Sequence, residues 1–188
     1  MSIFIVPTPE NVMERKQRVP GWTVIKLDRK AKREWLTLIA QLKERGVVHV
    51  YSSDLDTEAG QLLANELRVP LKHEFELRRF RIGRFHGIKL ADLGMLMERL
   101  EGKWKRNPAI PVREGDSLIS FQRRFARRFN TLLGQTETIA FVTDPLTIAY
   151  IRGGMDAHSL IPNGNPIDRK KIYKVSARSN EQAAQGVA

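Results

Sequence analysis

The residues best placed for chemistry in this chain are two adjacent serines, Ser52 and Ser53. They follow an apolar, β-type run and precede a helical pattern. Backbone N–H groups at such a junction bind anions, because the first N–H groups of a helix lack partners and the helix dipole adds positive potential. The pair is therefore a candidate phosphate cradle. An ordinary polar turn of an α/β protein would have the same sequence, so both interpretations stay open.

A second candidate is the basic loop 78–87, in which arginines alternate with aromatic residues. Arginine beside an aromatic ring suits phosphate contact and base stacking, as in sites for single-stranded nucleic acid. The alternative is a solvated loop that its phenylalanines anchor to the core. The candidate partner-binding residues of the loop are Arg78, Arg79, Arg81, Arg84 and His86.

A third basic surface is predicted on the helix expected at 116–133. Its apolar residues form one stripe, and its arginines lie on the opposite side at 100° per residue. This face could follow a phosphate backbone, or it could be the solvated side of an amphipathic helix. The arginines concerned are Arg123, Arg124, Arg127 and Arg128. Whether the basic clusters form one surface depends on the fold.

The overall charge favours an acidic partner. The chain has 32 Lys and Arg residues against 21 Asp and Glu residues, a formal net charge of +11. Such a balance raises the odds of binding RNA, DNA or an acidic protein. The apolar runs are too short to span a membrane. The N-terminus also lacks the basic and apolar regions of a signal peptide, so we expect a cytoplasmic protein without membrane contact.

Metal, disulfide and cofactor chemistry is not expected. The chain has no cysteine, which excludes disulfides, thiolate metal sites and a cysteine nucleophile. Its four histidines have no HxH or HExxH spacing, so a zinc site is not predicted either.

Hydrophobic periodicity and turn residues predict alternating strands and helices. Strands are expected at 2–6, 47–51, 136–143 and 171–175. Residues 74–77 are expected to be extended, and 102–113 irregular. Helices are expected at 29–45, 54–67, 90–100, 116–133 and 144–152, with a further short helix possible at 155–160. Asp144 is well placed to cap the helix that begins there. This order predicts a single three-layer α/β/α domain with a mostly parallel central sheet over residues 1–175. The small, polar residues 176–188 are expected to be a disordered tail.

The order of elements resembles the histidine phosphatase superfamily, which has the phosphoglycerate-mutase-like fold. Residues 51–55 (YSSDL) are similar to its Ser-Ser-x-Leu turn, and 77–87 (LRRFRIGRFHG) to its Leu-x-Glu-x-x-x-Gly-x-Trp-x-Gly segment. Residues 114–117 (EGDS) are similar to its Gly-Glu-Ser segment. Residues 139–144 (IAFVTD) are similar to the strand that carries its second catalytic histidine, and 3–9 (IFIVPTP) take the place of its Arg-His-Gly motif.

The resemblance implies a degenerate member of that family. The family's chemistry uses a phosphoryl-accepting histidine, two arginines and a second histidine around the phosphate, and an acidic residue that protonates the leaving group. The corresponding positions of this chain hold Pro7, Thr8, Thr57, Arg79 and Asp144. We therefore expect a pseudoenzyme without family-type catalysis, a basic binding or structural module for an acidic partner.

Two alternatives stay open beside this hypothesis. The first is a phosphatase or other hydrolase with a repositioned site, in which Thr8 is the nucleophile and Asp144 the base. A carboxylate is a poor base for a hydroxyl, because its reference pKa is about 4. The second is a homo-oligomer or a subunit of a larger assembly that uses the former active-site mouth as an interface.

Overall fold

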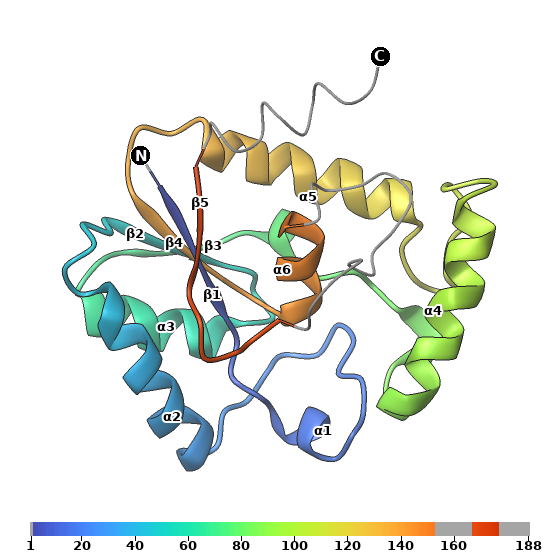
Figure 1. Ribbon diagram of the computed structural model, residues 1–188, viewed down its shortest axis with the longest axis horizontal. Helices are drawn as coiled ribbons and strands as arrows, with labels where there is room; N and C mark the ends of the chain where they lie inside the picture. The colour runs from blue at the N-terminus through green and yellow to red at the C-terminus, as the bar shows by residue number, and fades with distance from the viewer. Residues whose placement is uncertain (1, 153–166, 177–188) are drawn as a thin grey trace.

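The computed structural model describes residues 2–152 and 167–176 of the chain and shows a sheet between two layers of helices (Figure 1). The sheet has five strands in the order β3-β2-β4-β1-β5. Four are parallel: β1 (Ile3–Pro7), β2 (His49–Ser52), β3 (Leu71–His73) and β4 (Ile139–Thr143). The fifth, β5 (Tyr173–Val175), pairs antiparallel with β1. This arrangement confirms the predicted fold class.

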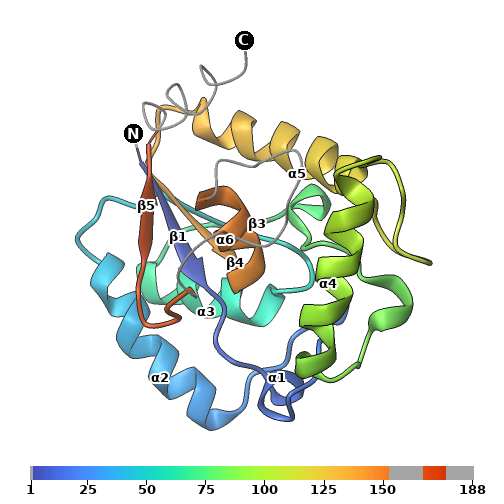
Figure 2. The same ribbon diagram turned by 45° about the vertical axis from the view of Figure 1, so that its right-hand side comes forward.

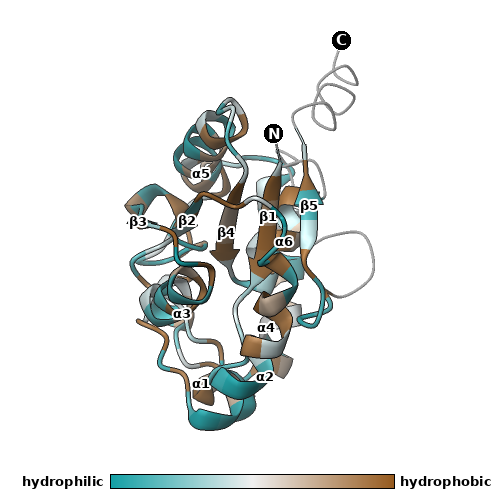
Figure 3. Cartoon of the chain, turned by 90° about the vertical axis from the view of Figure 1, so that its left-hand side faces the viewer, coloured by the Kyte–Doolittle hydropathy of each residue, from teal (hydrophilic) through white to brown (hydrophobic). Residues whose placement is uncertain are grey.

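The helices cover both faces of the sheet. One layer contains α2 (Arg29–Ile39) and α3 (Thr57–Leu67), and the other contains α5 (Leu118–Leu133) and α6 (Pro145–Arg152) (Figures 1 and 3). The short α1 (Val12–Arg15) follows β1, and α4 (Leu90–Trp104) lies beyond the sheet beside α5 (Figure 2). Three 3₁₀ turns add to these, at Ala40–Leu42, Phe75–Leu77 and Gly83–Phe85.

The central strand β4 is buried on both faces, because helices cover both sides of the sheet. Its side chains alternate: Ile139 and Phe141 belong to the core beneath α5 and α6, whereas Ala140 and Val142 belong to the core beneath α2 and α3. Figure 3 shows this strand as a hydrophobic band between more polar helix surfaces. The continuous apolar run that predicted the strand is the consequence of this double burial.

The amphipathic pattern of α5 is confirmed. Phe121, Phe125 and Phe129 are at most 1% exposed, and their rings follow one another at centroid distances of 5.5 and 5.6 Å. The helix begins one residue after Ser117, whose hydroxyl accepts a hydrogen bond from the Ser120 backbone N–H in a capping box. Burial of each ring contributes about 2–3 kcal/mol, so this helix is fixed firmly on the sheet.

Several elements differ from the prediction, which also did not include β3. Residues 75–77 form a 3₁₀ turn rather than an extended segment, because β3 ends at His73 and the Glu74 N–H already bonds to the Ser52 carbonyl. Helix α4 continues to Trp104, whose fully buried indole donates to the Ile110 carbonyl. The predicted helix 29–45 is regular only to residue 39 before its 3₁₀ turn. Helix α1 was not predicted.

Two predictions fall largely on other parts of the chain. The possible helix at 155–160 and the polar tail beyond Ser176 lie outside the described residues. The prediction that residues 1–175 form a single domain and that the tail is disordered therefore stays a prediction. Within residues 2–152 and 167–176, no helix is long and apolar enough to cross a membrane.

Candidate functional site

The carboxyl ends of the parallel strands bring three predicted site residues to one edge of the sheet. Thr8 follows β1, Ser53 follows β2 and Asp144 follows β4, and each is less than 9% exposed. The Thr8 backbone N–H donates to the Thr143 carbonyl at 2.8 Å, which continues the β1–β4 pairing to this point. In open α/β sheets this edge is where ligands bind, so it is the first place to look for a site.

A buried ion pair lies at this edge. The Arg79 guanidinium donates to Asp56 Oδ1, and the two side chains are only 8% and 1% exposed. Asp56 Oδ2 accepts a second hydrogen bond, from the Ser53 hydroxyl at 2.7 Å. Asp56 also stands at the N-terminus of α3, where the helix dipole favours a negative charge. The charge of Arg79 is therefore already matched by a carboxylate of the protein itself.

Burial and neighbouring charges both act on the pKa values of this pair. Burial alone lowers the pKa of Arg79, but the carboxylates of Asp56, Asp144 and Glu14 outweigh that effect and hold the pKa above its ordinary value. Burial raises the pKa of Asp56, against the opposing effects of Arg79 and Ser53. Arg79 is therefore a permanent buried cation surrounded by acidic groups.

The two serines of the predicted phosphate cradle make hydrogen bonds within the protein. Ser52 is fully buried, and its Oγ lies 3.0 Å from His73 Nδ1. Ser53 donates to Asp56 and accepts from the Leu55 N–H at 3.3 Å. In this conformation both hydroxyls serve the strand-to-helix junction itself.

The other two predicted positions also have structural roles. Thr57 is exposed, and its hydroxyl donates to the Asp54 carbonyl at 2.8 Å, so the residue that enters the edge is its neighbour Asp56. Asp144 caps α6 as predicted: Oδ1 accepts from the Leu146 and Thr147 N–H groups, and Oδ2 accepts from the Thr147 hydroxyl at 2.6 Å. Both carboxylate oxygens of Asp144 are thus occupied.

Three residues at this edge of the sheet were not among the predicted site residues. They are Asp56, Glu14 of α1 and Arg169, which precedes β5. Arg169 donates to the Thr8 carbonyl at 2.8 Å and to Glu14 Oε1 at 2.6 Å. The spacing Asn11-x-x-Glu14 is a capping-box pattern that could have indicated α1, whereas no local signal marks Arg169.

Together, these residues make the strand-end cluster, which we define as Thr8, Glu14, Ser53, Asp56, Arg79, Asp144 and Arg169. Three carboxylates face two guanidiniums here, so its described part is net acidic. Among the described residues, no group of three or more histidine, aspartate and glutamate side chains could hold a metal ion.

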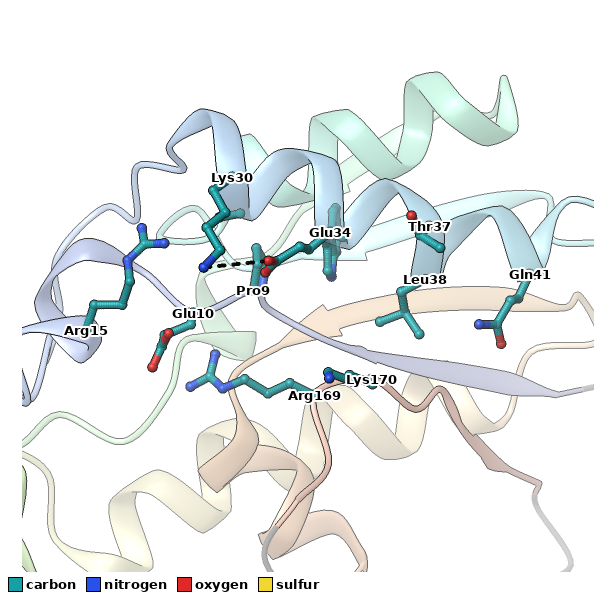
Figure 4. Close-up of a pocket in the computed structure, with 12 residues that line it drawn as sticks. Pro9, Glu10, Arg15, Lys30, Glu34, Thr37, Leu38, Gln41, Arg169 and Lys170 are labelled. Carbon is teal, nitrogen blue, oxygen red and sulfur yellow. Dashed lines mark ion pairs between the residues drawn. The ribbon is translucent and has the colours of Figure 1, made fainter.

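A groove of about 670 Å³ lies beside this cluster, between α2 and residues 169–170 (Figure 4). Leu38 and Trp35 supply its apolar wall, and the Trp35 indole donates to the Pro7 carbonyl at 2.8 Å. Four cations and two carboxylates line the groove as well: Arg15, Lys30, Arg169, Lys170, Glu10 and Glu34. Most of these charges are compensated, since Arg15 pairs with Asp28, Lys30 with Glu34 and Arg169 with Glu14.

A comparison with known protein families identifies the superfamily of this chain. The family model described as histidine phosphatase superfamily (branch 1) matches residues 8–182. The chain belongs to the histidine phosphatase superfamily. The resemblance noted in the sequence is thereby confirmed, over most of the chain.

Several solved structures have the same fold at low sequence identity. Bacillus stearothermophilus YhfR superposes with a TM-score of 0.75 at 15% identity, covering 92% of this chain and 89% of its own. The alpha-ribazole phosphatase of Shigella flexneri gives 0.72 at 15%, covering 93% and 89%. A Thermus thermophilus protein, TTHB049, gives 0.67 at 21%, covering 94% of each chain. A comparison with curated protein sequences finds no match.

In this histidine phosphatase superfamily member, the arginines of the basic loop differ in availability. Arg78 forms a two-pronged ion pair with Asp54, with Nε 2.6 Å from Oδ1, and lies over the rings of Phe75 and Trp22 at 4.3 and 4.7 Å. Arg79 is buried and does not belong to the surface. Arg81 is exposed and lies 5.2 Å from the Trp22 ring centroid.

The side chains of the last two candidate residues of the basic loop, Arg84 and His86, make exposed contacts with the rest of the protein. Arg84 and Glu114 form an exposed ion pair at 2.7 Å, of the kind that contributes little to stability. His86 is exposed, with Nδ1 3.4 Å from the Thr23 hydroxyl. Both groups remain accessible to a partner.

Of the four arginines of α5, two point inward and two point outward. Arg124 Nη1 donates to the Glu76 and Arg78 carbonyls at 2.8 Å, and Nη2 to Asp116 at 3.0 Å. Burial lowers the pKa of Arg124, against the opposing effect of Asp116. Arg128 pairs with Glu74. By contrast, Arg123 and Arg127 are exposed and form no ion pair with the described part of the chain.

These four arginines border a second groove, between α5 and the 3₁₀ turn 75–77. Its volume is about 780 Å³. We call it the arginine groove and define it by Phe75, Glu76, Arg123, Arg124, Arg127 and Arg128. Two interpretations of the face 123–128 were open, a phosphate-binding surface or the solvated side of the helix. Arg124 and Arg128 are not simply solvated, because they bond to other segments. Arg123 and Arg127 are exposed, and their role in binding stays a prediction.

Proposed function

We propose that this superfamily member does not catalyse phosphoryl transfer and instead binds an acidic macromolecule, nucleic acid or protein, through the arginine groove. The observation that carries the proposal is the Arg79–Asp56 ion pair. It neutralises within the protein the buried guanidinium of the strand-end cluster. The outward arginines of α5 have no such partner among the described residues.

The charge of the strand-end cluster supports the proposal that the protein does not catalyse phosphoryl transfer. A phosphoryl group is anionic, and its transfer needs positive donors aimed at it, each contributing about 3–4 kcal/mol to transition-state stabilisation. In the cluster Arg79 and Arg169 are both committed to carboxylates. An incoming phosphate would therefore meet excess negative charge.

The positions of the described imidazoles also support the absence of phosphoryl transfer. His73 is directed at Ser52, His49 lies at the first residue of β2, and His86 lies beside Thr23. None of these three imidazoles hydrogen-bonds to a residue of the strand-end cluster. His73 comes nearest in sequence terms, through Ser52, which precedes Ser53 of the cluster. A phosphohistidine intermediate needs an imidazole at the reacting position.

The alternative with Thr8 as nucleophile and Asp144 as base has little geometric support. Asp144 would have to give up hydrogen bonds from the N-terminus of α6 to accept a proton. Loss of such a cap costs about 1 kcal/mol of stability. Thr8 is also only 4% exposed, so a substrate would need the cluster to open.

The net charge of +11 supports the proposed binding of an acidic macromolecule. Long-range attraction brings an acidic partner to a basic protein, and unpaired arginines can then form charge-assisted, two-pronged hydrogen bonds with carboxylate or phosphate. In the arginine groove this requires no rearrangement of Arg123 or Arg127.

Two measurements test the proposal. A phosphomonoesterase assay with p-nitrophenyl phosphate should give background turnover that Thr8→Ala leaves unchanged. Turnover that disappears in Thr8→Ala would instead establish the hydrolase. Binding to labelled RNA, DNA and polyglutamate should be detectable at low salt and weaken steeply as salt rises; absence of all three would refute the binding function. A solution mass measurement would show whether the chain assembles with itself.

A further inference from the structure

The two basic clusters of the sequence meet at a pair of aromatic rings. Phe75 is 51% exposed and lines the arginine groove. The Trp22 ring meets it edge-on, with centroids 5.8 Å apart and an interplanar angle of 84°. Arg81 lies over Trp22. One surface therefore runs from Arg123 and Arg127 through Phe75 and Trp22 to Arg81.

We propose that this surface binds single-stranded nucleic acid, with Phe75 as a stacking platform for a base and Arg123 and Arg127 as phosphate contacts. The inference rests on the function proposed above for the arginine groove and names the class of its acidic partner.

The spacing of the unpaired charges fits a phosphate backbone. Arg123 and Arg127 are four residues apart on α5, so they are neighbours on one face of the helix, with Cβ atoms about 5–6 Å apart. Planar guanidiniums match phosphate oxygens in two-pronged geometry. Two adjacent phosphates of one extended strand can therefore each meet one arginine.

The exposed ring distinguishes the possible partners. A base of any identity can cover the half-exposed Phe75 ring by stacking. An acidic polypeptide would use the arginines alone. A duplex would present phosphates to the arginines but keeps its bases stacked inside. A single strand is the partner that uses both Phe75 and the arginines.

The platform is held in place before any ligand arrives. The Arg78 guanidinium lies 4.3 Å from the Phe75 ring centroid while it pairs with Asp54. Arg124 donates to the carbonyls of Glu76 and Arg78, which fixes the chain on either side of Leu77. Pre-ordered groups lose little entropy on binding, so this arrangement favours association.

The groove beside α2, on the opposite face of the sheet, is a weaker candidate for the same ligand. Arg15, Lys30 and Arg169 are paired with carboxylates there, and its tryptophan, Trp35, is only 3% exposed. Charge and aromatic exposure thus both favour the arginine groove.

The test is a fluorescence-anisotropy titration of the full chain with labelled dodecamers of dT and rU, a duplex of equal length, and polyglutamate. We expect the single strands to bind more tightly than the duplex or polyglutamate. Phe75→Ala should weaken single-strand binding roughly 5- to 150-fold without changing its salt dependence, and Phe75→Tyr should retain it.

The charge contacts have a separate readout. Arg123→Ala/Arg127→Ala should lower the slope of log affinity against log salt by about 1.4, the value for two phosphate contacts on a single strand. Arg29→Ala/Arg33→Ala is the matched control. It also removes two exposed arginines at i, i+4 from a helix, α2, on the opposite face of the sheet. This control should keep the wild-type affinity of the groove for the strand within about 2-fold.

Each outcome decides the proposal, provided that circular dichroism shows every variant to be folded. Equal binding of single strand and duplex, or a Phe75→Ala variant that binds as the wild type does, overturns the single-strand assignment and leaves the acidic-partner function standing. Tighter binding of polyglutamate assigns the groove to acidic proteins. If no probe binds at low salt, both the inference and the function proposed above are wrong.

Discussion

The Arg79 guanidinium and the Asp56 carboxylate form an ion pair in which neither side chain is more than 8% exposed. The pair links the N-terminus of α3 to the segment after the 3₁₀ turn 75–77. A buried pair gains little net stability, because desolvation offsets most of the attraction. Its main effect here is on specificity: it fixes the basic loop against the end of β2 and occupies the edge at which this class of sheet binds ligands.

Removal of either Asp56 or Arg79 alone should therefore lower the free energy of unfolding substantially. We expect Asp56→Ala to lower the free energy of unfolding by about 3–5 kcal/mol, because Arg79 would be left buried without a counter-charge. Urea denaturation at pH 7 measures this. The double variant Asp56→Ala/Arg79→Met removes both charges and should recover most of the loss. A double variant as unstable as the single one would show that the pair itself, rather than an orphaned charge, is responsible.

Arg123 and Arg124 offer a second comparison, since they are adjacent in sequence but differ in role. Arg124→Ala should cost about 2–4 kcal/mol, because the Asp116 carboxylate and the carbonyls of Glu76 and Arg78 lose a charged donor. Arg123→Ala should change stability by less than about 0.5 kcal/mol, as expected of an exposed side chain. Thermal or urea unfolding of the two variants would reveal the difference, and equal effects would contradict the assigned roles.

Much of the fold could be predicted from local patterns. The apolar run of β4 and the phenylalanine stripe of α5 each reflect burial that leaves a regular trace in the sequence. Asp144 was predicted as a cap because a carboxylate directly before a helix has few other roles. The prediction of an extended segment at 74–77 was wrong for residues 75–77, because the apolar ends of this turn are compatible with either structure and the pairing of β3 depends on tertiary contacts.

The site was less predictable because its chemistry depends on partners far apart in the chain. Arg79 and Asp56 were both visible in the sequence, but only the fold brings them together. The division of the α5 arginines into inward and outward members depends on whether a carbonyl or carboxylate of another segment lies within reach. Helical periodicity places all four on the polar side and cannot separate them.

The Asp54–Arg78 pair should make stability depend on acid. The hydrogen bond from Arg78 lowers the pKa of Asp54 below its ordinary value of 3.8, against the effect of burial. A carboxylate with a lowered folded-state pKa contributes stability above its unfolded pKa and loses it as the pH falls through the folded one. Asp54→Asn should therefore destabilise the protein at pH 6, and this destabilisation should shrink as the pH falls below 3.8 towards 2.

The effect should be small, below about 1 kcal/mol, because the Asp54 side chain is 41% exposed and solvent screens the pair. The check is urea unfolding of wild type and Asp54→Asn from pH 6 to pH 2. In an Arg78→Gln background the same substitution should lose most of its pH dependence. Persistence of the full dependence without Arg78 would assign it to another group.

Gly60 sets the distance between α3 and the sheet. A Cβ atom at this position would lie 2.6 Å from Ser52 Oγ, 3.0 Å from Ser52 Cβ and 3.1 Å from Leu71 Cδ1. Ala is the better helix former by about 1 kcal/mol, but overpacking a fitted contact costs about 1–3 kcal/mol. We expect Gly60→Ala to be destabilising by about 1–2 kcal/mol, and Gly102→Ala, which has open space around it in α4, to be neutral or stabilising. Urea unfolding of both variants separates packing from propensity, and a stabilised Gly60→Ala would mean that α3 can move away from β2 without loss.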